Sequence, residues 1–244
     1  MGMVFGEVAD TYDDVRPGYP EAIADAVRDY HGGAPERIVE IGAGTGLGTR
    51  VLLRLGAPVT CLEPDPRMAA RLAANLPQVT VHTETFEQWQ PPERGVPLIA
   101  AALSWHWLDP ATRNQRAHDA LTPGGTLAVF GHTYGYADPA QSRAIDTALR
   151  TIDPEVTSRP AGWFHLDIAA SGLFADVRAH TVDRDLALPT DRYLDLVRTF
   201  GPFRQHAAAQ QARALAAVRA LVDGFGGAIV LRLRTTLVLA RRPH

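Results

Sequence analysis

The sequence predicts an α/β fold, in which helices cover both faces of a doubly wound, seven-stranded, mostly parallel sheet. Three observations support this prediction. Short apolar segments alternate with helical patterns of about ten residues over residues 20–130, as in βαβ units. A glycine-rich stretch, Val39–Thr49 (VEIGAGTGLGT), joins a predicted strand to a predicted helix, where such sheets bind ligands. The 244 residues, 46% of them hydrophobic, suffice to bury the core of one domain.

The first half of the chain supplies most of the parallel sheet. In Pro20–Tyr30 (PEAIADAVRDY), apolar residues recur at helical spacing, and the pair Gly32–Gly33 ends the helix. The segments that follow alternate regularly. Strands are expected at Arg37–Ile41, Val59–Leu62, Val79–Val81, Val96–Leu103 and Gly125–Phe130, and helices at Leu47–Leu55, Arg67–Leu76 and Thr112–Leu121.

The second half departs from this rhythm. Because the pair Gly226–Gly227 precedes the last apolar run, we expect that run to form an antiparallel strand at the edge of the sheet. We expect Asp153–Gly172 to be irregular and Ala137–Gly172 to be an insertion, because it is too short to hold its own core. The remaining elements are helices at Asp138–Ile152, Asp191–Phe200 and His206–Val222, and strands at Val177–Leu186 and Ala228–Ala240.

Composition excludes several kinds of chemistry. The net charge of −3 argues against binding nucleic acid through bulk electrostatics. All 24 basic residues are Arg, which excludes a lysine Schiff base, a phosphate-binding P-loop lysine and a lysine general base. The nine His residues form no H-x-x-x-H or H-E pairing, so we expect no metal site.

The sequence also predicts a cytoplasmic protein without a membrane partner. Its single cysteine, Cys61, permits no internal disulfide and suits a reducing compartment. The start, MGMVFGEVAD, lacks the basic region and apolar core of a secretory signal. The longest apolar run, Val96–Leu108, is too short to span a bilayer.

The spacing of the glycines separates two classes of ligand. A dinucleotide fingerprint needs G-x-G-x-x-G, but its sixth position is Leu47 when counted from Gly42 and Thr49 when counted from Gly44. Glu40, two residues before the first glycine, would oppose a pyrophosphate but suits a cationic ligand. A turn without any ligand is the remaining alternative.

The pattern E-x-G-x-G-x-G in this stretch resembles the first motif of class I S-adenosylmethionine-dependent methyltransferases. Glu63, twenty-one residues after Gly42, ends the strand VTCLE, where a carboxylate can accept both ribose hydroxyls. The resemblance implies S-adenosylmethionine as cofactor and S-adenosylhomocysteine as its product. The residues expected to bind it here are Glu40, Gly42, Ala43, Gly44, Gly46, Glu63 and Pro64.

Two further segments are similar to the methyltransferase branch that includes the ubiquinone/menaquinone C-methyltransferases and trans-aconitate methyltransferase. Phe5–Pro20 (FGEVADTYDDVRPGYP) matches its N-terminal segment, which implies that Tyr12 and Arg16 face the methionine carboxylate of the cofactor. A surface arginine is the alternative for Arg16. Glu84–Glu87 (ETFE) matches the adenine site, although it departs from the usual residues and leaves the acceptor of the adenine amino group open. The resemblance implies cofactor contacts from Glu84, Thr85, Phe86 and Ser104.

Two histidines at the carboxyl ends of strands are candidate general bases. His106 lies in LSWHWLDP, which is similar to a run of this branch, and a histidine titrates near neutrality. His132 lies in FGHTYGY, which we expect to be a binding loop. The alternatives are a structural corner for His106 and a solvated loop for His132. The side chains expected to contact the acceptor are Tyr19, Trp107, Tyr134, Tyr136 and, in an aromatic lid, Trp163, for which ordinary core packing is the alternative.

The leading hypothesis is a bacterial, cytoplasmic methyltransferase that acts on a small-molecule acceptor by O-, N- or C-methylation, in secondary metabolism. The alternatives are a nicotinamide oxidoreductase, a non-catalytic S-adenosylmethionine-binding protein, and an RNA or protein methyltransferase. We expect a monomer or a homodimer. We interpret residues 1–244 as a single domain with N-terminal cap helices (1–33), a cofactor-binding half (34–136), a lid-like insertion (137–173) and a C-terminal half (174–244).

Overall fold

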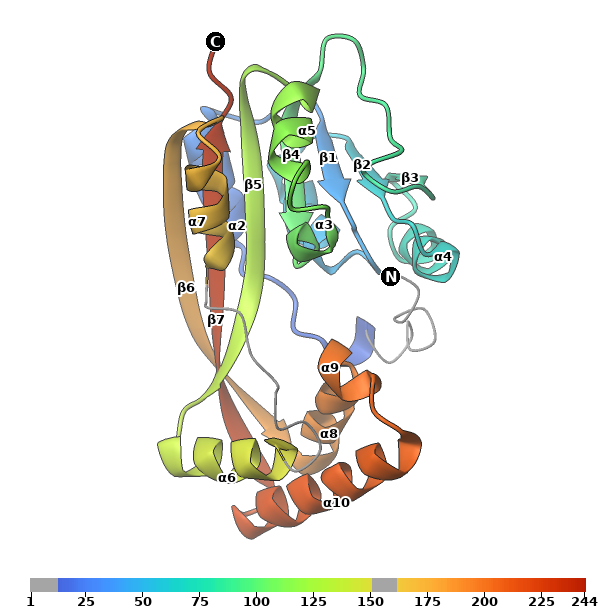
Figure 1. The fold of residues 1–244 in the computed structure, drawn as a ribbon, viewed down its shortest axis with the longest axis vertical. Coiled ribbons are helices and arrows are strands. Elements are labelled where there is room, and N and C mark those ends of the chain that lie inside the picture. The colour runs from blue at the N-terminus through green and yellow to red at the C-terminus, as the bar shows by residue number, and fades with distance from the viewer. Residues whose placement is uncertain (1–12, 151–161) are drawn as a thin grey trace.

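A computed structural model describes residues 13–150 and 162–244 of the chain. In these residues, seven strands form one sheet in the order β3-β2-β1-β4-β5-β7-β6 (Figure 1). Strands β1 to β5 pair in parallel, whereas β7 runs antiparallel to both β5 and β6. The predicted fold class is confirmed. The strands are β1 (Ile38–Ile41), β2 (Val59–Leu62), β3 (Thr80–His82), β4 (Val96–Ala102), β5 (Leu121–Tyr136), β6 (Ala175–Pro189) and β7 (Ala228–Arg241).

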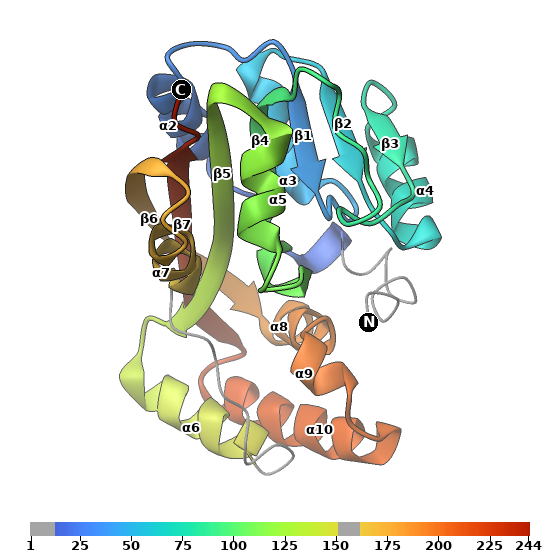
Figure 2. The ribbon, with the colours of Figure 1, turned by 45° about the horizontal axis from the view of Figure 1, so that its top comes forward.

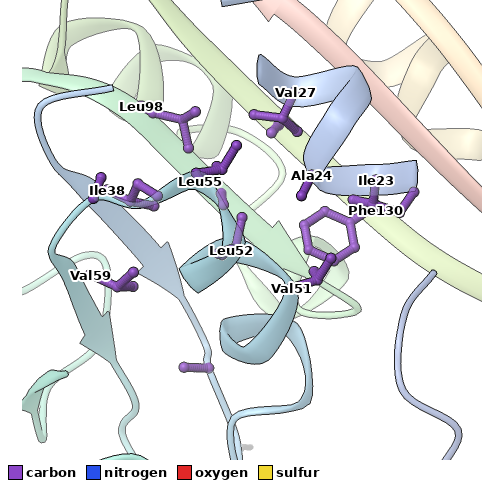
Figure 3. Packing of buried hydrophobic residues seen from close by; sticks show 14 of the residues in the cluster. Ile23, Ala24, Val27, Ile38, Val51, Leu52, Leu55, Val59, Leu98 and Phe130 are labelled. Carbon is purple, nitrogen blue, oxygen red and sulfur yellow. The ribbon is translucent and has the colours of Figure 1, made fainter. Parts of the chain in front are cut away.

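Helices cover both faces of the sheet (Figures 1 and 2). One apolar cluster joins the sheet to α2 (Ala22–His31), α3 (Leu47–Leu52) and α4 (Pro66–Asn75), and a second joins it to α5 (Arg113–Ala120) and α7 (Trp163–Ala170). Because side chains alternate along a strand, neighbouring residues of β4 enter different clusters, and five of its seven residues are buried. Figure 3 shows the first cluster, in which the side chains of α2 and α3 meet those of β1, β2, β4 and β5.

Local signals set the helix ends beside the glycine-rich stretch. The carboxylate of Asp65 accepts a hydrogen bond of 2.9 Å from the backbone N–H of Arg67, and Pro66 occupies the first helical position of α4. At the other end of this layer, α2 stops at Gly32, whose φ of 92° is accessible to glycine. A single-turn 3₁₀ helix, η2 (Leu53–Leu55), continues α3, and a second, η3 (Trp105–Trp107), follows β4.

The last three strands are much longer than the others. β5, β6 and β7 contain 16, 15 and 14 residues, against four each in β1 and β2, so they project beyond the rest of the sheet (Figure 1). Four helices gather around their projecting ends and share a third apolar cluster (Figure 2). These are α6 (Pro139–Arg150), α8 (Thr190–Arg198), α9 (Gly201–Arg204) and α10 (Ala208–Gly224). We call residues 131–150 and 182–235 the extension.

Three expectations about the second half are corrected. The segment FGHTYGY (130–136) is not a loop, because it continues β5 and pairs with β7. The last strand, β7, lies between β5 and β6 rather than at the edge of the sheet. Residues 153–172 are not wholly irregular, because they include α7. The two described helices of the expected insertion join different clusters: α6 packs in the extension and α7 against the sheet.

Among the described residues, no helix combines the length and the apolar character that crossing a membrane would require.

Candidate active site

A cavity of about 1370 Å³ opens beyond the carboxyl ends of the parallel strands. The strand order reverses between β1 and β4, which is where sheets of this topology bind ligands. Most of the expected site residues line this cavity. They are Arg16, Tyr19, Gly42, Ala43, Gly44, Glu63, Pro64, Thr85, Phe86, Ser104, His106, Trp107, His132 and Tyr134. Glu40, Gly46, Glu84, Tyr136 and Trp163 are not part of the lining, and Tyr12 lies outside the described residues.

The glycine-rich stretch turns sharply above β1. Gly42, Gly44 and Gly46 have φ values of +62°, +59° and +100°, which other residues adopt only with strain. A Cβ on Gly42 would lie 2.6 Å from the Cβ of Ser104, whereas one on Gly44 would approach only the end of Met68, at 4.0 Å. Gly44 therefore leaves open space for a ligand at the cavity wall.

Gly46 serves packing rather than the cavity. A Cβ at this position would lie 2.7 Å from Cδ1 of Leu72 and 2.8 Å from Cδ1 of Leu76, both in the α4 region. Gly46 is also the residue that precedes α3. The residue lets helix α4 approach the turn, and its expected contact with a cofactor stays a prediction.

Glu63 presents a carboxylate that the backbone holds in place. Its Oε2 accepts a hydrogen bond of 2.8 Å from the N–H of Gly44, and its Oε1 accepts one of 2.9 Å from the N–H of Asp65. Burial raises the pKa of Glu63, while these two backbone donors act in the opposite direction. The carboxylate lines the cavity with both oxygens oriented, and each keeps acceptor capacity for a ligand hydroxyl.

Glu40 lies beneath the turn and does not reach the cavity. Its side chain is fully buried, and its Oε2 accepts a hydrogen bond of 2.6 Å from the hydroxyl of Thr49. A Cβ on Gly48 would lie 2.4 Å from Oε1 of Glu40, so only glycine at position 48 leaves room for the Glu40 carboxylate. Burial raises the pKa of Glu40 to about 8. Here Glu40 supports the turn from below, and its expected contact with a cofactor stays a prediction.

Only part of the segment expected to bind adenine lines the cavity. Thr85 and Phe86 line the cavity, and the backbone carbonyl of Phe86 accepts a hydrogen bond of 2.9 Å from Arg116. Glu84 instead pairs with His82 at 3.1 Å, outside the lining. Its expected role toward the adenine stays a prediction.

The turn after β4 brings His106 and Trp107 to the cavity. Leu103 adopts a φ of +54°, a conformation uncommon for a residue with a side chain, and its N–H donates to the carbonyl of Phe130 at 2.9 Å. The hydroxyl of Ser104 donates to the carbonyl of Ile41, at the end of β1. Backbone strain of this kind is typical of functional sites.

His132 reaches the cavity from β5, but both of its ring nitrogens are engaged. Its Nε2 lies 3.3 Å from the carbonyl of Pro17, which can only accept, so Nε2 carries the proton. Nδ1 then accepts from the hydroxyl of Thr235 at 2.8 Å. Burial, reinforced by Arg184, lowers the pKa of His132 to about 3, so the ring is neutral at pH 7. It stacks on Tyr19 with ring centroids 4.2 Å apart.

Arg16 is directed at the extension. Its Nε donates to the hydroxyl of Thr199 at 2.9 Å and its guanidinium also donates to the carbonyl of Thr199 at 3.0 Å. The same guanidinium lies 5.0 Å from the ring centroid of Phe200 and 5.9 Å from that of Tyr134. Arg16 thus lines the cavity while joining the N-terminal segment to the end of α8.

The sequence reasoning missed the wall of the cavity that the extension supplies. The usable signal was FGPF, an aromatic pair around a Gly-Pro break between two helical patterns. Periodicity alone could not assign these residues to the cavity. They are Leu149, Val197, Phe200, Gly201, Phe203, Gln205 and His206.

Two expected acceptor contacts lie elsewhere. The hydroxyl of Tyr136 is 2.6 Å from that of Tyr193, within the apolar cluster of the extension. Trp163 begins α7 and packs against the second cluster, with the guanidinium of Arg113 5.0 Å from its ring centroid. The position of Trp163 agrees with core packing, the alternative to an aromatic lid.

Comparisons with known proteins agree with this geometry. Residues 38–125 match the family model of the methyltransferase domain. An uncharacterized methyltransferase of Mycobacterium tuberculosis is 33% identical over 133 residues, which are 54% of each chain. Trans-aconitate 2-methyltransferase of Rhizobium meliloti is 32% identical over 93 residues, 37% of this chain and 36% of that one. The chain thus spans about half the length of the first of these curated relatives.

Solved structures share the fold at low sequence identity. A candidate type II methyltransferase from Anaeromyxobacter dehalogenans has a TM-score of 0.67 at 20% identity, over 94% of this chain and 99% of that one. Phosphoethanolamine N-methyltransferase 2 of Haemonchus contortus, solved with phosphomonomethylethanolamine and S-adenosylhomocysteine, has a TM-score of 0.57 at 14% identity, over 98% and 58%. The [4+2]-cyclase SpnF has a TM-score of 0.58 at 14% identity, over 99% and 95%.

The sheet order, the glycine turn and the backbone-held Glu63 define a protein of the class I, Rossmann-like methyltransferase fold. Within it, residues 38–125 are the part of the chain that matches the model of the methyltransferase domain.

Proposed function

We propose that the protein is an S-adenosylmethionine-dependent methyltransferase acting on a small-molecule acceptor. The observation that carries this proposal is that one cavity joins the cradle of Gly44 and Glu63 to the aromatic wall of the extension. At about 1370 Å³ the cavity exceeds the roughly 300–1,000 Å³ of a typical single-ligand pocket, so it has room for two ligands. The open space at Gly44 fits a ligand close to the backbone.

The residues that would hold the cofactor follow from their places in the lining. Glu63 would accept the ribose hydroxyls, and Thr85 and Phe86 would border the base. When bound, S-adenosylmethionine supplies a methyl group activated by a sulfonium leaving group. The task of the protein is to align the acceptor and exclude water. The cradle is completed by Gly42, Ala43, Pro64 and Ser104.

Of the two candidate general bases, His132 is poorly suited to take up a proton, because its pKa is lowered to about 3. His132 has Nε2 committed to Pro17 and Nδ1 to Thr235, so it would have to break a hydrogen bond to take up a proton. His106 stands on the turn after β4, at the carboxyl edge of the sheet, and lines the same cavity. We assign to His132 the role of a neutral platform that holds Tyr19 and Pro17.

The finer parts of the proposal rest on composition. A single buried thiol, Cys61, supports a bacterial cytoplasmic location, and the acidic net charge supports a small molecule over a nucleic acid. O-, N- and C-methylation are all compatible with the lining. We also propose one domain, a monomer or homodimer, and a role in secondary metabolism.

A second candidate is an enzyme or binding protein that uses the same cofactor cradle without methyl transfer. This candidate is kept because the chain shares its fold with the [4+2]-cyclase SpnF over 99% of its length.

The test combines binding with turnover. Calorimetry should detect S-adenosylhomocysteine binding and no response to NADH; the reverse result would overturn the proposal in favour of an oxidoreductase. Turnover is then measured as tritium transferred from methyl-labelled S-adenosylmethionine to a panel of phenols, carboxylates and amines. Cofactor binding without any labelled product from a broad panel would favour the second candidate.

The two histidines are compared in the same assay. His106→Gln should lose most of the product formation at saturating cofactor, whereas His132→Gln should retain a larger share. If both variants keep the full rate, neither residue is a base, and catalysis proceeds by alignment alone.

A further inference from the structure

The turn that carries His106 is held, on its side away from the cavity, by a largely buried ion pair. Asp167 of α7 pairs with Arg113, the first residue of α5, through both carboxylate oxygens. The Nε of Arg113 donates to Oδ2 of Asp167 at 3.0 Å. The side chains of Arg113 and Asp167 are 7% and 20% exposed. Such a pair is tolerated only where further hydrogen bonds satisfy its remaining polar groups.

Those further bonds connect the pair to the turn. Trp105 donates from its indole Nε1 to Oδ2 of Asp167 at 2.9 Å, and Asn114 donates to the same oxygen at 3.2 Å. Arg113 in turn donates to the backbone carbonyl of Trp105 at 3.4 Å. Its guanidinium also lies over the rings of Trp163 and Trp105, at 5.0 and 5.9 Å. The backbone and the side chain of Trp105 are thus both fixed.

Trp105 begins the single turn of η3, which also contains His106 and Trp107. Trp105 is 2% exposed and does not line the cavity, whereas the other two residues do. One side of the turn therefore contacts the ion pair, and the other side faces the ligands. Ser104 and Leu103 fasten the same turn to the sheet, through the carbonyls of Ile41 and Phe130.

We propose that Asp167 is a positioning residue, which holds the Trp105–Trp107 turn through Trp105 and Arg113 and thereby directs the imidazole of His106 into the acceptor side of the cavity. This inference rests on the proposed role of His106 in methyl transfer. A buried ion pair stabilises a fold little more than an apolar contact of the same size. Its main consequence here is a fixed orientation of the turn.

The test follows the imidazole of His106 directly. In protein labelled with ¹³C-histidine and saturated with S-adenosylhomocysteine, the Cε1–H resonance of His106 is assigned by its loss in His106→Gln. Asp167→Asn keeps the size of the side chain but removes its charge, and should shift and broaden this resonance. Because Asp167 lies outside the cavity lining, the S-adenosylhomocysteine Kd should change by no more than about twofold.

A matched control separates this effect from the loss of any ion pair. Asp183→Asn removes an exposed pair with Arg234 on the long strands, and should leave the resonance of His106 unchanged. Should Asp167→Asn fail to fold, Trp105→Phe removes the indole N–H while keeping an aromatic ring, and should shift the same resonance.

The inference would be overturned if the His106 resonance of Asp167→Asn were identical to that of the parent protein. The same criterion applies to Trp105→Phe if that variant replaces Asp167→Asn. Failure of the proposed function gives a different result: S-adenosylhomocysteine would not bind the parent protein. The comparison of resonances then proceeds in the unliganded protein and still decides whether Asp167 positions His106.

Discussion

The proposed cofactor side and the proposed acceptor side of the cavity are built in different ways. The proposed cofactor side includes one contiguous glycine turn and a carboxylate, Glu63, fixed by two backbone N–H groups. The proposed acceptor side includes side chains from segments far apart in the sequence, such as Tyr19, Tyr134 and Phe200. Cofactor recognition of this kind leaves a local sequence pattern, whereas acceptor recognition depends on tertiary packing.

Each side also has a buried ionisable group with a shifted pKa, raised in one and lowered in the other. Glu40, under the glycine turn, favours its protonated form because burial raises its pKa to about 8. His132, where β5 enters the extension, favours its deprotonated form because its pKa is lowered to about 3. Each is therefore uncharged near neutrality, and charges at the cavity are left to residues such as Glu63 and Arg16.

The largest effect is expected from Gly44→Val on the cofactor side. The added side chain would occupy the open space at the cavity wall, in a backbone conformation with a φ of +59°. Overfilling a packed site costs up to about 3 kcal/mol, so S-adenosylmethionine should bind about a hundredfold more weakly by calorimetry.

Gly56→Val is the matched control, because Gly56 also has a positive φ, of +78°, but a Cβ there would have nothing within 4 Å and the residue lies outside the cavity lining. It should share the backbone strain and keep the affinity. Equal losses in both variants would show that strain, not the cradle, governs binding.

Glu63→Gln should have the next largest effect. It removes the charge and replaces one acceptor oxygen by a donor facing a backbone N–H, either of Gly44 or of Asp65. Hydrogen bonds to charged groups contribute about 1.5–3 kcal/mol, so S-adenosylmethionine should bind roughly tenfold to a hundredfold more weakly. Glu84→Gln, outside the lining, should bind as the parent does. An effect of Glu84→Gln as large as that of Glu63→Gln would restore Glu84 to the site.

The two buried ionisable groups, His132 and Glu40, are expected to change the stability of the fold with pH in opposite directions. Between pH 3 and 6.5 the unfolded state binds a proton at His132 that the folded state does not, so this group makes stability rise with pH. Between pH 4.5 and 8 the folded state holds a proton at Glu40 that the unfolded state releases, so this group makes stability fall with rising pH. The two contributions oppose each other between pH 4.5 and 6.5.

Removing either group should expose the other. Relative to the parent, His132→Gln should lose stability more steeply as pH rises from 5 to 6.5, and Glu40→Gln should gain it. Each difference should reach about 2 kcal/mol over this range, measured by urea unfolding. Profiles parallel to that of the parent would show that neither group is titrated by unfolding.

The smallest effect is expected from Tyr136→Phe in the extension. The change leaves the buried hydroxyl of Tyr193 without the partner it has at 2.6 Å, which should cost about 1–2 kcal/mol of stability. Affinity for S-adenosylmethionine should stay unchanged, because neither tyrosine lines the cavity. Weaker cofactor binding in this variant would mean that the two sides are coupled more tightly than their contacts indicate.

The contrast between the two sides also explains what the sequence could predict. The order of strands and helices up to Phe130 follows from local apolar patterns, and the fold class was predicted from them. The glycine spacing with Glu63 indicated a cradle because all its parts belong to two consecutive βα turns. Gly46 and Glu40 belong to the same pattern, but only packing reveals that they support the turn rather than line the cavity.

The extension was harder to predict for a physical reason. The glycines, His132 and tyrosines of residues 131–136 are compatible with a loop, and they form a strand because they pair with β7 nearly a hundred residues later. The same pairing brings His132 to Thr235. Tertiary contacts of this kind override local propensity and leave no local signal.

The position of β7 inside the sheet has a consequence for the order of folding. In the described sheet, β6 has β7 as its neighbour, so the pairing of β5, β7 and β6 cannot be completed before the segment latest in the chain has inserted between two earlier ones. Closing such long loops is entropically costly and slow. A chain arrested before that step would lack the wall that the extension supplies, and both apolar clusters of the sheet would lack the β7 side chains that they contain. Completion of the whole cavity would therefore wait for the last strand.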